Sequence, residues 1–138
     1  MKSFNGGFME NIRVLLVEDN PDDEYLATWV LKKGGIGLVS VARDGREALD
    51  MLYGEGDGTD LNPDLVILDL RLPKIDGKEV LGRIRGDSRT RNLPVLVLTS
   101  SEDSGDRDSC RKLGIIDYCS KPLREEDIRK ALNSIGRG

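Results

Sequence analysis

The sequence contains no histidine. This absence excludes Ser-His-Asp and Cys-His nucleophilic catalysis, and it leaves few ligands for zinc. It also means that the chain carries no phosphohistidine, so any phosphoryl chemistry here requires another acceptor. The two cysteines, Cys110 and Cys119, are well separated and form no CxxC pair. We therefore expect free thiols rather than a disulfide or a metal site.

Long apolar runs and an excess of positive charge are also missing. The longest apolar runs, at 14–17, 65–68 and 95–98, are far too short to span a bilayer. The first ten residues, MKSFNGGFME, contain no run suited to a signal peptide, and we interpret residues 1–10 as a flexible tail. The net charge of -4 argues against a nucleic-acid surface. We therefore expect a cytoplasmic protein that binds neither membranes nor nucleic acid.

The composition is that of one soluble domain, which we place at residues 11–138. With 138 residues, 38% hydrophobic and 33% charged, the chain can bury a core without a disulfide or a structural metal. Apolar runs that predict strands alternate with amphipathic segments. The predicted strands are 12–17, 37–42, 64–70, 94–99 and 115–120.

The segments between these runs have recognisable helix starts. Asn20 before Pro21, Asp44, and Asp76 with Glu79 are typical N-terminal caps. The expected apolar stripes are Leu26, Trp29 and Val30 in the first helix; Ala48, Leu49 and Leu52 in the second; Val80, Leu81 and Ile84 in the third; Ile128, Ala131, Leu132 and Ile135 in the last. The fourth segment, 102–112, is almost entirely polar and predicts the most weakly held helix. Five strands alternating with five helices predict a single doubly wound α/β domain with a five-stranded parallel sheet.

Polar residues fall where four of the predicted strands end. The first strand ends in Glu18 and Asp19, the third in Asp69, the fourth in Thr99, and the fifth is followed by Lys121. Ligands bind beyond the carboxyl ends of the strands in such sheets, so we expect these side chains to meet. Each alone has an ordinary structural explanation, such as a helix cap or a surface turn. Together on one edge they predict a site.

The chemistry of these residue types is mutually consistent. Three carboxylates close together stay ionised at low cost only near a cation, and Mg²⁺ prefers such oxygen ligands. Asp69 is then placed to attack a phosphoryl group and become an aspartyl phosphate. Lys121 supplies a positive charge and Thr99 a hydroxyl donor for the phosphoryl oxygens.

The chain resembles the receiver domains of two-component response regulators. The matching motifs are VLLVEDNPDD, VILDLRLPKIDG, PVLVLTSS and DYCSKP, in the order of the family, over about residues 11 to 136. The resemblance implies a flavodoxin-like fold with strand order 2-1-3-4-5. It also implies that the protein accepts a phosphoryl group from a sensor histidine kinase. The chain further resembles stand-alone receivers that are paired with phytochrome-type sensor kinases. This likeness rests on Asn20-Pro21 followed by Asp22-Asp23, and on the absence of an output domain within these residues.

The resemblance assigns a role to each site residue. Glu18, Asp19, Asp69 and the backbone carbonyl of Arg71 would bind Mg²⁺, and Asp69 would be the phosphoacceptor. Thr99 would be the switch hydroxyl, Lys121 the phosphate-contacting lysine and Tyr118 the switch aromatic. Arg71 and Ser101 resemble positions that tune dephosphorylation. The Lys121-Pro122 bond is expected to be cis. The signal would leave through the surface of the fourth helix, fifth strand and fifth helix, toward a downstream protein or a second copy.

Two other functions fit parts of the pattern. A phosphatase of the haloacid-dehalogenase type also forms an aspartyl phosphate, but it would have a second aspartate where this chain has Arg71. A receiver fold that acts only as an unphosphorylated interaction module would be expected to lack an acid or the lysine. All of them are present here.

Overall fold

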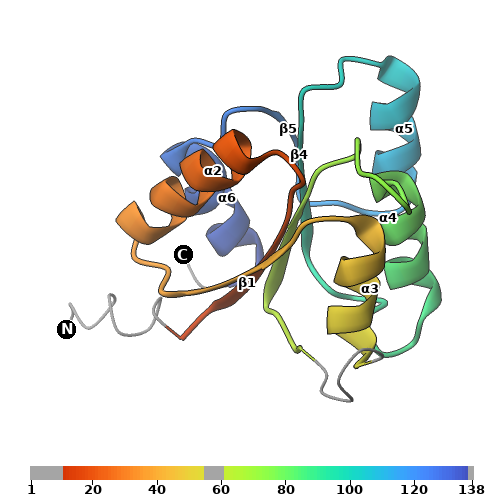
Figure 1. Cartoon of the computed structure of the whole chain (residues 1–138), viewed down its shortest axis with the longest axis horizontal. Coiled ribbons are helices and arrows are strands. Elements are labelled where there is room, and N and C mark those ends of the chain that lie inside the picture. The colour runs from red at the N-terminus through yellow and green to blue at the C-terminus, as the bar shows by residue number, and fades with distance from the viewer. Residues whose placement is uncertain (1–10, 55–60, 137–138) are drawn as a thin grey trace.

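The computed structural model describes residues 11–54 and 61–136. The predicted tail at residues 1–10 lies outside this range. Within it, five parallel strands form one sheet in the order β2-β1-β3-β4-β5 (Figure 1). The strands are β1 (Arg13–Val17), β2 (Leu38–Ala42), β3 (Leu65–Leu68), β4 (Val95–Thr99) and β5 (Tyr118–Ser120). Both the parallel sheet and its strand order agree with the prediction.

Helices follow the strands in alternation, and the described residues contain five of them. They are α2 (Pro21–Lys33), α3 (Gly45–Tyr53), α4 (Gly77–Gly86), α5 (Ser104–Lys112) and α6 (Glu125–Ser134). The three predicted caps are present. The Asn20 side chain accepts hydrogen bonds from the backbone N–H groups at the start of α2, and Asp44 and Asp76 do the same for α3 and α4. Among the described residues, no helix combines the length and apolar character needed to cross a membrane.

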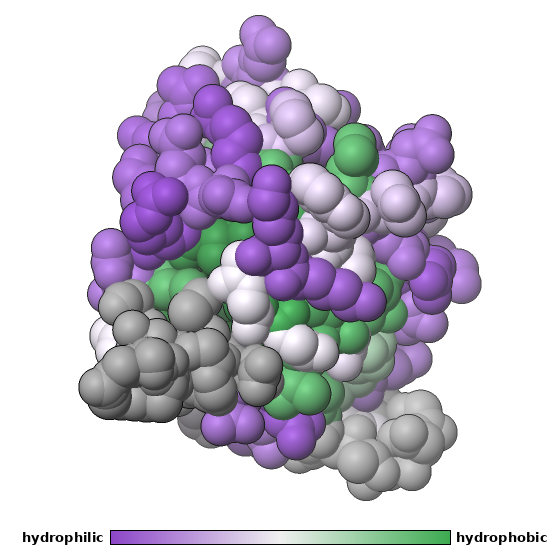
Figure 2. All heavy atoms as spheres, turned by 90° about the vertical axis from the view of Figure 1, so that its left-hand side faces the viewer, coloured by the Kyte–Doolittle hydropathy of each residue, from purple (hydrophilic) through white to green (hydrophobic). Residues whose placement is uncertain are grey.

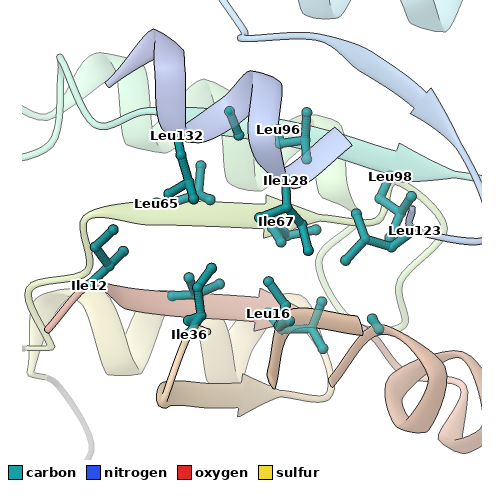
Figure 3. Close-up of a cluster of buried hydrophobic side chains, with 14 of the residues drawn as sticks. Ile12, Leu16, Ile36, Leu65, Ile67, Leu96, Leu98, Leu123, Ile128 and Leu132 are labelled. Atoms are coloured by element: carbon teal, nitrogen blue, oxygen red, sulfur yellow. The ribbon is translucent and has the colours of Figure 1, made fainter. Parts of the chain in front are cut away.

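The sheet lies between two helical layers, with α2 and α6 on one face and α3, α4 and α5 on the other (Figure 1). Each strand sends alternate side chains to the two faces. Leu16 and Ile67 belong to the core on the α2 and α6 side, where Ile128 of α6 packs toward β3 (Figure 3). Leu15 and Val66 belong to the core beneath the other three helices. Strands buried on both faces explain the continuous apolar runs in the sequence.

The predicted apolar stripe of the first helix was wrong in part. Ala27 and Leu31 are the buried residues of α2, whereas Leu26 is 47% and Trp29 is 53% exposed. Apolar residues occupy more than one face of this helix, so its periodicity does not specify which face meets the sheet. The small Ala27 lets the helix approach the sheet closely. Figure 2 shows the surface on this side of the molecule, where hydrophobic groups emerge among hydrophilic ones.

The last strand is shorter than predicted, and α5, which precedes it, is held by few buried residues. The strand predicted at 115–120 is regular only over Tyr118–Ser120. Gly114 adopts a positive φ of 80°, and the Arg85 side chain donates to its carbonyl oxygen, so the chain joins the sheet late. Helix α5 buries only Asp106 and Cys110. It forms where predicted, and its low stability stays a prediction.

Candidate functional site

One edge of the sheet collects the residues that the sequence singled out. Glu18 and Asp19 follow β1, and Asp69 follows β3. Thr99 is the last residue of β4, and Lys121 follows β5. The strands are parallel and in register, with Val17 of β1 opposite Leu68 of β3, so the residues that follow them emerge side by side. The structure thus brings the side chains of Glu18, Asp19, Asp69 and Lys121 together and places Thr99 at the end of the adjacent strand, while the roles of these residues stay predictions.

Three carboxylates form the centre of the site. Glu18 and Asp69 are only 2% and 4% exposed, whereas Asp19 is open to solvent. One oxygen from each of the three lies within 4.8 Å of the others. Three hard oxygen donors on a partly open rim fit Mg²⁺, which binds through a few carboxylates and keeps water or phosphate oxygens in its remaining positions.

Lys121 lies against these acids. Its Nζ is 2.8 Å from Glu18 Oε1, 2.9 Å from Asp69 Oδ2 and 2.8 Å from Asp23 Oδ2. Burial alone would lower the pKa of Lys121, but the hydrogen bonds to Asp23, Asp69 and Glu18 outweigh it and raise that pKa. The lysine is therefore a permanent cation that compensates the buried negative charge.

Burial shifts the pKa of Glu18 in the opposite direction to that of Lys121. It raises the pKa of this carboxyl, because the charged form loses hydration, while hydrogen bonds from Lys121 and the Asn20 N–H partly offset the shift. Asp69 adds to the rise through its own charge. A carboxylate this buried can carry its charge only beside positive charge, and Lys121 supplies one at 2.8 Å from Glu18 Oε1.

The loop after β3 fixes the orientation of Asp69. The Arg71 N–H donates to Asp69 Oδ1 at 3.3 Å, so that both carboxylate oxygens have partners. Gly77, at the start of α4, packs against the same backbone: an added Cβ would lie 2.1 Å from the Asp69 carbonyl oxygen. Its N–H donates to the Leu70 carbonyl at 2.9 Å. Only glycine permits this close approach.

The proposed switch residues are joined by Ser101. Thr99 is fully buried, and its Oγ1 accepts a hydrogen bond from the Ser101 N–H at 3.2 Å. Tyr118 is half-buried, and its hydroxyl donates to the Ser101 carbonyl at 3.3 Å. Burial raises the pKa of Tyr118. These two hydrogen bonds connect Thr99 to the loop that leads into α5 and to the aromatic ring on β5.

Sequence reasoning missed two residues near the site, Asp23 and Asp106. Asp23 contacts Lys121, although its sequence position indicated only a helix-start acid. Asp106 is buried on α5, where its side chain accepts from Ser101 Oγ at 2.9 Å and pairs with Lys78 Nζ at 2.8 Å. The only available signal for Asp106 was an acid in an otherwise solvated helix. Its partners come from other elements and are invisible in a linear pattern.

An open cleft of about 490 Å³ runs beside the carboxylates, and its lining includes Asp19, Leu70, Arg71, Leu72, Pro73, Asp76, Lys78, Asp103 and Asp106. The cleft reaches Asp19, the exposed member of the three carboxylates. The Lys121-Pro122 bond is cis, as expected. Cys110 and Cys119 are free and buried, which confirms the expected thiols.

Comparison with known proteins gives a consistent result. The model of the response regulator receiver domain matches residues 14–133. A probable methanogenesis regulatory protein, FilR2, of Methanothrix harundinacea is 41% identical over 88% of this chain and 79% of its own length. The solved structure of the bacteriophytochrome response regulator AtBRR has a TM-score of 0.80 at 39% identity and covers 93% of this chain and 95% of its own.

A second solved structure is informative about metals. It is the Mn(2+)-bound form of the response regulator Rcp1, with a TM-score of 0.76 and 35% identity, covering 90% of this chain and 91% of its own. Receiver domains bind Mg²⁺ or Mn²⁺ in an acidic pocket, and an acidic pocket is what Glu18, Asp19 and Asp69 form.

Proposed function

This chain belongs to the response regulator receiver domain family, and on that premise we propose that Asp69 accepts a phosphoryl group from a sensor histidine kinase. Receiver domains are signalling modules that take phosphate from histidine kinases and are generally not enzymes. The observation that carries the proposal is the convergence of Glu18, Asp19, Asp69 and Lys121 on one sheet edge.

Asp69 is the nucleophile of the proposed reaction. A carboxylate oxygen attacks the phosphorus of the kinase's phosphohistidine, the P–N bond breaks, and its electron pair returns to the imidazole nitrogen. Lys121, now 2.9 Å from Asp69 Oδ2, is placed to contact a phosphoryl oxygen bound to that carboxylate. Thr99 donates its hydroxyl to another phosphoryl oxygen. The protein's contribution is positioning and charge compensation.

Mg²⁺ is the proposed cofactor, held by Glu18, Asp19, Asp69 and the backbone carbonyl of Arg71. When bound, it neutralises the negative charge of the phosphoryl oxygens. The short distance between the three carboxylate oxygens supports the carboxylate part of this ligand set. The buried position of Glu18 also supports it, because an ionised carboxylate in that place requires nearby positive charge.

The proposed output is a rearrangement of α5, β5 and α6. When Thr99 turns to the phosphoryl group it gives up its hydrogen bond from the Ser101 N–H, so the loop before α5 moves. Tyr118, held to the Ser101 carbonyl, then turns inward. Helix α5 follows easily because it buries so little. The altered face binds a downstream protein or a second copy of this chain.

The proposed donor is a phytochrome-type sensor kinase in the cytoplasm. This assignment rests on the likeness to AtBRR, described as a bacteriophytochrome response regulator. The identity of the kinase is independent of the chemistry at Asp69, because a receiver with another kinase partner would keep the same site.

Metal binding tests the proposal against an unphosphorylated interaction module. Titration calorimetry should detect one Mg²⁺ per chain, with binding weakened at least tenfold in Glu18→Gln and Asp19→Asn. Wild-type protein that is folded yet binds no Mg²⁺ would favour the interaction module. Hydrogen exchange should also change across residues 102–120 on phosphorylation, and an unchanged pattern there would contradict the proposed output.

A further inference from the structure

Three polar side chains from separate segments meet at Asp106. Its side chain is only 11% exposed. Lys78 Nζ, from the first turn of α4, is 2.8 Å from Asp106 Oδ1. Ser101 Oγ donates to Oδ2 at 2.9 Å, and Arg71 Nη2 lies 3.8 Å from the same oxygen. Arg71 Nη2 also donates to Ser101 Oγ at 3.4 Å. One buried acid thus holds a lysine, a hydroxyl and a guanidinium.

Arg71 links this cluster to the phosphoacceptor. It lies two residues after Asp69, and its N–H donates to Asp69 Oδ1. The Arg71 side chain is 68% exposed and therefore free to reorient, whereas Asp106 is fixed by its other two partners. A guanidinium has five donors in a planar fork that matches phosphate as well as carboxylate. A phosphoryl group on Asp69 therefore competes with Asp106 for the same cation.

We propose that Asp106 is a positioning residue that shortens the life of the aspartyl phosphate by holding the Arg71 guanidinium away from it. This inference rests on the proposed function and adds the residue that regulates it. The two partners of the guanidinium define two arrangements. In one, Arg71 pairs with Asp106 and the phosphoryl group is open to water. In the other, Arg71 covers the phosphoryl group.

The step affected is hydrolysis. The oxygen of a water molecule attacks phosphorus, the P–O bond to Asp69 breaks, and its electron pair restores the carboxylate, while a water proton leaves to solvent and inorganic phosphate departs. Attack must occur in line with the breaking bond. A guanidinium paired with the phosphoryl oxygens occupies space on the approach side. Releasing Arg71 from Asp106 therefore slows hydrolysis.

If Asp106 had only a structural role, its substitution would act on the phosphoryl lifetime through the packing of α5 and not through Arg71. The ion pair between Asp106 and Lys78 connects α5 to α4. Loss of Asp106 would therefore also weaken the attachment of α5. Lys78→Met removes that ion pair and leaves the partner of Arg71 in place, which makes it the matched control. Arg71→Ala removes the guanidinium itself, so it tells whether any effect of Asp106 passes through Arg71.

The test compares phosphoryl lifetimes in five folded proteins: wild type, Asp106→Asn, Lys78→Met, Arg71→Ala and the Asp106→Asn/Arg71→Ala double variant. Each is labelled with acetyl phosphate and Mg²⁺, freed of donor and followed by intact mass. Asp106→Asn should lengthen the lifetime about two- to five-fold, a range consistent with an exposed ion pair. Lys78→Met should not lengthen it. Arg71→Ala should shorten it, and the double variant should match Arg71→Ala.

Three results would overturn the inference: an Asp106→Asn lifetime equal to that of the wild type, an equal lengthening in Lys78→Met, or a lengthening that persists without Arg71. In each of these the wild type is labelled, so the proposed function stands. A folded wild type that gains no phosphoryl group would overturn the proposed function and this inference with it. Asp106→Glu, which keeps the charge, should restore a lifetime close to that of the wild type.

Discussion

The ammonium of Lys121 lies 2.9 Å from Asp69 Oδ2, although 52 positions separate the two residues in the chain. This pair joins the ends of β3 and β5, which are not neighbours in the sheet, since β4 lies between them. The same Nζ contacts Glu18 and Asp23. Lys121 is therefore both a structural counter-charge and, in our proposal, a ligand for phosphate.

Replacing Lys121 with methionine should destabilise the protein by about 3 kcal/mol in the absence of Mg²⁺, because two buried carboxylates lose their counter-charge. Added Mg²⁺ should raise the melting temperature of Lys121→Met more than that of the wild type, because the metal restores positive charge among the acids. Thermal and urea denaturation with and without Mg²⁺ measure both effects. Lys130→Met, which breaks the exposed pair with Asp117, is the control and should cost less than 1 kcal/mol.

Two glycines of α4 should respond oppositely to alanine. Gly77→Ala should destabilise the protein by at least 2 kcal/mol and weaken Mg²⁺ binding, because its Cβ would collide with the Asp69 backbone. Gly82→Ala places a Cβ where nothing lies within 4 Å, so it should be neutral or stabilise by up to about 1 kcal/mol. Urea denaturation of both variants is the measurement, and equal effects would contradict the close packing of α4 on Asp69.

Asp106 should stabilise the fold in a pH-dependent way. Hydrogen bonds from Lys78 and Ser101 lower the pKa of Asp106. A lowered folded-state pKa gives stability that is present above the ordinary aspartate pKa, about 3.9, and is lost as the pH falls through the folded value.

The difference in unfolding free energy between the wild type and Asp106→Asn should therefore be constant from about pH 8 to pH 5 and shrink below about pH 4. Urea denaturation across this range measures it. In a Lys78→Met background the pH dependence should weaken, since Lys78 is the largest cause of the shift. A difference that grows toward low pH would have the wrong sign for this account.

Both thiols should resist modification in the native protein. Burial raises the pKa of Cys119 to about 12 and also raises that of Cys110, so neither forms much reactive thiolate near neutral pH. Ellman's reagent should label neither cysteine in buffer and both in denaturant. Rapid native labelling of Cys110 would contradict this prediction and would show that α5 opens readily.

The sequence was sufficient for the features that depend on local pattern. Short segments are enough to identify the helix caps at Asn20, Asp44 and Asp76 and the polar residues at the ends of the strands. Parallel pairing of the strands then brings those polar residues to one edge of the sheet. The fold class followed from apolar runs alternating with amphipathic segments. These inferences needed no knowledge of side-chain conformation.

Other features depend on contacts that a linear pattern does not contain. The Asp23 to Lys121 bond spans 98 positions, and the cluster at Asp106 draws on three other segments. The exposure of Trp29 was missed because apolar residues occupy more than one face of α2. These contacts arise only when the helices dock, and in our proposal the Asp106 cluster sets the lifetime of the aspartyl phosphate.

The most direct test of the central claim is the intact mass of the protein after incubation with Mg²⁺ and acetyl phosphate. We predict a gain of one labile phosphoryl group, absent without Mg²⁺ and absent in Asp69→Asn. A gain of the same size in Asp69→Asn would place the acceptor elsewhere. No gain in wild-type protein that is folded and binds Mg²⁺ would contradict the claim that Asp69 is a phosphoacceptor.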